Sequence, residues 1–166
     1  VVVGRLIPAG TGLAYHEGTL YGSRTVDSVA DPEAIYTIDP ATLSATLYLT
    51  YNVPIDQTDI GGLAVDPATG DLYGTNDAAA LRGLVRIGAD GIVTVVAPYP
   101  AGQTDIDGLA IGDGRAYLVT DEPGDFYVFD FATLTYTTPI TNPWTTSEIF
   151  AGAAWITEPA APTPSL

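Results

Sequence analysis

Three acidic turns hold the residues best suited to binding a metal ion. Asp59, Asp105 and Glu148 each stand three or four residues before a phrase that begins with glycine. If these phrases are neighbouring strands, the three carboxylates form an arc, and Ca²⁺ takes several oxygen ligands of this kind. The alternative is that each carboxylate accepts hydrogen bonds from nearby backbone N–H groups and fixes its own turn. We favour the second interpretation, and expect no tight Ca²⁺ binding and no other cofactor.

The other reactive side chains form no catalytic set. His16 is the only histidine, so no second histidine can complete a metal pair or a proton shuttle. No Gly-x-Ser-x-Gly turn and no phosphate-binding glycine loop occurs. Most tyrosines recur at repeating strand positions, which indicates packing. Tyr99, Trp144 and Trp155 lie outside that register and are our candidates for surface contacts with a ligand.

The charge of the chain is strongly one-sided. Five arginines and no lysine stand against 20 acidic residues, which gives a formal net charge of −15. Such a field repels phosphate backbones and anionic lipids, so we expect no nucleic-acid partner and no docking to a membrane. Cysteine is absent, which excludes disulfides and thiolate metal sites. A hydrophobic fraction of 46% and a length of 166 residues suit one folded domain.

The elements that must position these residues come from an internal repeat. One phrase occurs three times and then a fourth time in altered form, and successive copies begin 50, 46 and 44 residues apart. Repetition at such a period indicates stacked copies of one supersecondary unit. The four copies are Gly12-Leu13-Ala14-Tyr15, Gly62-Leu63-Ala64-Val65, Gly108-Leu109-Ala110-Ile111 and Gly152-Ala153-Ala154-Trp155.

Each of the first three copies opens a unit of four short strands. Apolar runs alternate with turn signals such as Asp-Pro-Ala-Thr, which predicts hairpins joined into a small antiparallel sheet. We expect one domain over residues 1–156, with sheets at about 12–50, 62–97 and 108–141, terminal strands at 1–7 and 152–156, and a proline-rich tail at 157–166.

Residues 12–155 resemble the repeat β-propellers of exported bacterial proteins. The resemblance rests on the Gly-Leu-Ala phrases, on Leu72-Tyr73-Gly74 and on Ile38-Asp39-Pro40-Ala41-Thr42. It implies an all-β, propeller-like array of three four-stranded antiparallel blades plus two terminal strands, which makes a partial or small propeller. The innermost strand of each blade then lines a central channel. A β-sandwich is the competing fold, and the phase-locked repetition argues against it.

A second resemblance covers residues 1–16. The sequence VVVGRLIPAGTGLAYH is similar to a segment near the C-terminus of the beta-prime subunit of bacterial RNA polymerase. The metal-binding aspartate motif of that subunit is nowhere in this chain, so no polymerase function is carried over. Recombination or a constructed fusion would explain such a segment.

These observations favour a non-catalytic interaction or assembly module. We expect it to be extracellular or in the cell envelope, and to associate with itself through the terminal strands, because unpaired strand edges recruit other chains. One alternative is a propeller enzyme, a lyase or hydrolase acting on a sugar or lactone with an acidic site at the channel end. Another is a recombined or designed chimera without an evolved function. The identity of any protein or glycan ligand is left open.

Overall fold

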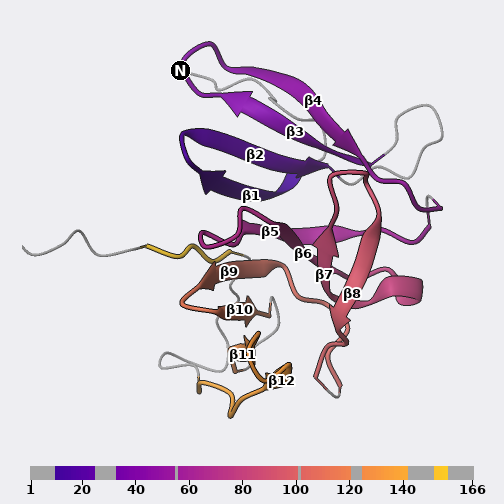
Figure 1. Ribbon diagram of the computed structural model, residues 1–166. Coiled ribbons are helices and arrows are strands. Elements are labelled where there is room, and N and C mark those ends of the chain that lie inside the picture. The colour runs from indigo at the N-terminus through magenta and orange to yellow at the C-terminus, as the bar shows by residue number, and fades with distance from the viewer. Residues whose placement is uncertain are drawn as a thin grey trace, which may run out of the picture.

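The computed structural model describes residues 10–24, 33–54, 56–100, 102–120, 125–141 and 152–156. These residues form three four-stranded antiparallel sheets and one short 3-10 helix, η1 (Ala79–Leu81) (Figure 1). The expectation of an all-β fold with three four-stranded sheets is therefore confirmed. The sheets follow one another without closing into a ring within the described residues. None of these residues belongs to a helix long and apolar enough to cross a membrane.

Each sheet is a meander in which neighbouring strands follow one another along the chain. The first sheet contains β1 (Gly10–His16), β2 (Thr19–Arg24), β3 (Ala34–Asp39) and β4 (Ser44–Thr50). The second contains β5 (Ile60–Val65), β6 (Leu72–Asn76), β7 (Gly83–Ile87) and β8 (Val93–Ala97). The third contains β9 (Gly108–Gly112), β10 (Arg115–Val119), β11 (Tyr127–Asp130) and β12 (Thr135–Tyr136).

Strand β1 lies entirely within the segment of residues 1–16. It pairs with β2 from Gly10 opposite Arg24 to His16 opposite Thr19. The Thr11 hydroxyl also donates a hydrogen bond of 2.6 Å to the Ile60 carbonyl in the second sheet. The second half of this segment is thus an integral strand of the fold, whereas residues 1–9 lie outside the described residues.

The Asp-x-Ala-Thr phrases form turns that the aspartate side chains hold in place. The Asp39 carboxylate accepts hydrogen bonds from the Ala41 and Thr42 N–H groups, at 2.8 and 3.3 Å. These hydrogen bonds, with one from the Thr42 hydroxyl, lower the pKa of Asp39. Asp66 accepts from Ala68 in the same way, at 2.9 Å. This is the local use of a carboxylate that competes with metal binding.

The glycine of each phrase lets the next inner strand approach. A β-carbon on Gly12 would lie 2.8 Å from the Leu63 nitrogen, and one on Gly62 would lie 2.7 Å from the Asp107 carbonyl oxygen. One on Gly108 would lie 3.2 Å from the Gly152 backbone. Because backbone atoms cannot move aside as a flexible side chain can, only glycine permits the spacing at Gly12 and Gly62. The strand β1 therefore lies beside β5, and β5 lies beside β9 (Figure 1). Residues 152–156 lie against β9.

Buried hydroxyl groups support the inner strands of the first two sheets. Both strands are irregular in register near their glycines, which turns one N–H group away from the ladder. Ser23 accepts from the Gly12 N–H at 2.8 Å, and Thr75 accepts from the Gly62 N–H at 2.6 Å. Both hydroxyl residues are fully buried. In the third sheet Val119 pairs directly with Gly108, and no such group is needed.

The hydrophobic core lies between consecutive sheets. One cluster joins the first and second sheets through residues such as Ile35, Leu63 and Val85. The other joins the second and third through residues such as Leu84, Leu109 and Phe129. Each buried Leu or Ile contributes about 1.5–3 kcal/mol relative to an exposed one. The sheets are consequently stabilised by their neighbours in the stack.

We predict that Thr75→Val lowers the free energy of unfolding by about 1–3 kcal/mol, because it leaves the buried Gly62 N–H without an acceptor. Thr75→Ser is the control: it keeps the hydroxyl, as Ser23 does in the first sheet. Denaturant unfolding of both variants checks this. Equal losses for Val and Ser would contradict the assigned role of the hydroxyl.

Candidate functional site

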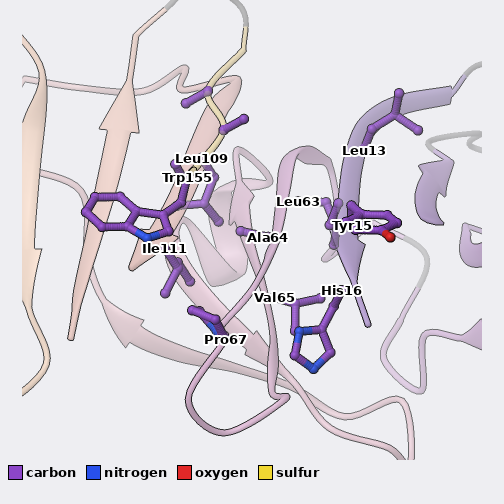
Figure 2. Close-up of a pocket in the computed structure, with 14 residues that line it drawn as sticks. Leu13, Tyr15, His16, Leu63, Ala64, Val65, Pro67, Leu109, Ile111 and Trp155 are labelled. Atoms are coloured by element: carbon purple, nitrogen blue, oxygen red, sulfur yellow. The ribbon is translucent and has the colours of Figure 1, made fainter. Parts of the chain in front are cut away.

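The four repeated phrases meet at one pocket. Figure 2 shows Leu13, Tyr15 and His16 on one side, Leu63 to Val65 in the middle, and Leu109, Ile111 and Trp155 on the other side. The fourth phrase thus takes part although its sequence is altered. Sequence reasoning predicted that the inner strands line a common channel, and these strands do share one pocket.

The pocket is apolar and poor in reactive groups. Among its described lining residues, only His16 and Tyr15 carry titratable side chains. The His16 Nε2 atom lies 3.9 Å from a Glu17 carboxylate oxygen, an ion pair only when the imidazole is protonated. No nucleophile is aligned with His16 among these lining residues. The surface is therefore suited to apolar contact more than to bond-breaking chemistry.

The three aromatic candidates have different outcomes. Trp155 lines the pocket, and its ring stacks on that of Tyr117 at 5.5 Å between centroids. Tyr99 is only 8% exposed and belongs to the core between the second and third sheets. The expectation that Tyr99 lies on the surface is therefore wrong, because its side chain is packed into that core cluster. Trp144 lies outside the described residues.

A second feature is a group of carboxylates that precedes β9. Oxygen atoms of Asp77, Asp105 and Asp107 all lie within 4.8 Å of one another. Asp77 follows β6, and its carboxylate accepts a 3.3 Å hydrogen bond from the Ile106 N–H, which lies just before β9. The Tyr99 hydroxyl is buried beside Asp77 without a hydrogen bond of ordinary geometry. The group thus links the second sheet to the turn that leads into the third.

Only one of the three predicted metal ligands belongs to this group. Asp105 is present, but Asp59 is not, and its backbone N–H instead donates to the Asn76 side chain at 2.6 Å. Glu148 lies outside the described residues. Asp77 was missed because it follows a second strand, whereas the prediction considered only the turns before the first strand of each sheet.

Asp77 is held in an environment that favours its neutral form. Burial raises the pKa of Asp77 to about 7, and the nearby Asp105 and Asp107 carboxylates add to the increase. The interaction with the Tyr99 hydroxyl and the hydrogen bond from the Ile106 N–H act in the opposite direction and lower this pKa. The only described guanidinium bonded to this residue, that of Arg82, donates from Nε to the Asp77 backbone carbonyl at 3.1 Å. A proton on Asp77 therefore relieves the repulsion among the three carboxylates.

We predict that Asp77 makes the fold less stable as the pH rises from about 4 to 7. The folded state retains the proton in this range, whereas the unfolded chain, with a pKa of 3.8, releases it. Above about pH 7 the penalty is constant. Asp77→Asn keeps an acceptor for Ile106, so it should be more stable than the parent at pH 8 by about 1–2 kcal/mol, a value reduced for solvent contact.

Unfolding curves at pH 5 and pH 8 measure this difference, with Asp56→Asn at an exposed site as the control for net charge. A parent and an Asp77→Asn variant that respond equally to pH would refute the assignment.

No known family profile and no curated protein sequence matches this chain. Among the solved structures that resemble it in fold are the following two. One is a computationally designed protein named Ika4, at 14% identity and a TM-score of 0.52, covering 84% of this chain and 76% of the other. The second is a protein of unknown function from Bacteroides thetaiotaomicron, at 15% identity and a TM-score of 0.52, covering 79% of this chain. This chain spans 31% of that protein, and at such identities the likeness concerns the fold alone.

Proposed function

We propose that this chain is a non-catalytic interaction or assembly module, built as part of a β-propeller and self-associating through its terminal strands. Three meander sheets with their first strands side by side are the arrangement of propeller blades. Propellers typically contain four to eight blades. The three described sheets are fewer than this number, and we propose that a second copy of the chain covers the ends of the array.

The observation that carries this proposal is the position of residues 152–156. They run beside β9 where the inner strand of a fourth sheet belongs, and Trp155 packs on Tyr117. The expected terminal strand at 152–156 is not formed in the structure, because these residues pair with none of the described strands. A segment in this position that has no strand partner can pair its backbone groups with a further strand. Val1 to Ile7, an apolar run rich in valine, is the candidate in the sequence.

The pocket supports binding over catalysis. Its walls are made mainly of Leu, Ala, Val and Ile side chains. The excess of negative charge disfavours nucleic acid and anionic membranes as partners. We further propose an extracellular or cell-envelope location, as the resemblance to exported propellers implies.

The alternative function is that of a propeller enzyme acting on a sugar or lactone. The group of Asp77, Asp105 and Asp107 is the observation that favours it, since such carboxylates can hold Ca²⁺ or act as acid and base. If the chain hydrolyses or eliminates such a substrate, and Asp107→Asn abolishes that activity, the result would support this alternative over the assembly module.

We predict that the intact chain is an oligomer, and that deletion of residues 1–7 reduces it to a monomer because the terminal strand loses its partner. Deletion of the tail at 157–166 is the control and should leave the mass unchanged. Native mass spectrometry gives the mass of each species. An intact monomer that is destabilised by the deletion would instead indicate closure within one chain, and a deletion without effect on mass or melting would contradict both versions.

A further inference from the structure

The two faces of each sheet have separate partners in the stack. We call the face turned toward the preceding sheet the front face, and the opposite one the back face. In the second sheet Leu63 and Val65 belong to the front face and are only 2% and 9% exposed, because the first sheet covers them. In the third sheet Leu109 and Ile111 occupy the same positions and are each 2% exposed. In both contacts between sheets, the front-face side chains of the inner strand are therefore buried by the preceding sheet.

The front face of the first sheet has no such cover. Leu13 and Tyr15 are the equivalents of Leu63 and Val65, and they are 63% and 71% exposed. Leu20, on the next strand, is half-buried, whereas its equivalent Leu72 is 8% exposed. The side chain positions that are buried in the second and third sheets are therefore exposed to solvent in the first sheet.

At the other end of the stack, the back face of the fourth phrase is exposed. The alanine of each phrase lies on the back face, where Ala14, Ala64 and Ala110 are buried at 5–7% exposure. Ala154, their equivalent in the fourth phrase, is exposed. The glycines of the first three phrases each have the next inner strand within close reach, whereas nothing lies within 4 Å of a β-carbon on Gly152.

We infer that the front face of the first sheet binds the Gly152–Ile156 end of a second copy of this chain. One end presents Leu13 and Tyr15 without an alanine-lined back face, and the other presents Ala154 without a front face. In both internal contacts the alanine of one phrase belongs to the same buried cluster as the front-face side chains of the next phrase. The contact between copies would bring Ala154 and the pair Leu13 and Tyr15 into this arrangement. This inference rests on the proposed function and identifies the surfaces through which the copies meet.

Such a contact is heterologous, because two different surfaces of the chain meet. It generates a ring if the rotation between copies closes, and a filament if it does not. The contacting residues are uncharged, but the chain carries a net charge of −15, so the copies repel one another at long range. Association should therefore strengthen as salt rises toward about 0.15 M, where the Debye length is about 8 Å.

Two variants, each spoiling one end, test the inference. Tyr15→Glu places a charge on the front face, and Ala154→Glu places one at the opposite end. Both residues are exposed, so each variant should keep the circular dichroism spectrum of the parent. Leu134→Glu is the matched control, since Leu134 is 67% exposed in a turn far along the chain.

Native mass spectrometry and sedimentation at about 0.15 M salt should give an oligomer for the parent and for Leu134→Glu. Each of the other two variants should be a monomer. An equimolar mixture of the two should form a dimer, because one intact front face then meets one intact end. This rescue is the expected result, since a merely misfolded variant could not produce it.

Three results would overturn the inference: a monomeric parent, an oligomer that survives Tyr15→Glu, or a mixture that forms no dimer. The deletion of residues 1–7 separates this contact from strand pairing. If the deletion dissolves the oligomer but Tyr15→Glu does not, strand pairing stands and the face contact falls. If Tyr15→Glu dissolves it and the deletion does not, the face contact stands without the terminal strand.

Discussion

The close approach of consecutive inner strands is the constraint on which this structure depends. At Gly12 and Gly62 the backbone that leads into or forms the next inner strand lies at 2.7–2.8 Å from the position of a β-carbon, a distance that β-carbons essentially never show. The neighbouring Leu, Val and Ile side chains can then reach across to the preceding sheet. Without that approach the two clusters of core residues would separate, and each sheet alone would be too small to be stable.

This constraint also explains why buried polar groups are found beside the glycines. The pairing register of β1 and β5 is irregular where the inner strands approach. There the Ser23 and Thr75 hydroxyls accept hydrogen bonds from the Gly12 and Gly62 N–H groups. The Asp77 carboxylate accepts a hydrogen bond from the Ile106 N–H and so fixes the segment that connects the second sheet to the third. Polar side chains thus secure the joints between sheets, while apolar side chains supply the stabilising burial.

The architecture was predictable from the sequence because its signals are local and repeated. The phrase at Gly62 and the turn at Asp66 are patterns within a few residues, and the repeat copies them. The grouping of Asp77 with Asp105 was not predictable in the same way, since it depends on which loops adjoin when two sheets stack. Tyr99 was misjudged for a similar reason: it follows β8, outside the repeating register, yet the third sheet covers it.

The open ends follow from the same repeat. Because each repeat carries the residues for both surfaces of the contact between sheets, the first and the last repeat carry them too. The structure therefore has one uncovered front face and one uncovered end that carry the same pattern as the buried contacts.

The most direct test of the central constraint compares Gly62→Ala with Gly152→Ala in the dilute monomer. The first variant places a β-carbon 2.7 Å from the Asp107 carbonyl oxygen and 3.0 Å from the Leu109 β-carbon, whereas the second has no atom within 4 Å. Denaturant unfolding should show a loss of about 1–3 kcal/mol for Gly62→Ala and a change within about 0.5 kcal/mol for Gly152→Ala. Equal stability of the two variants would contradict the account, because the inner strands would then not require glycine to stack.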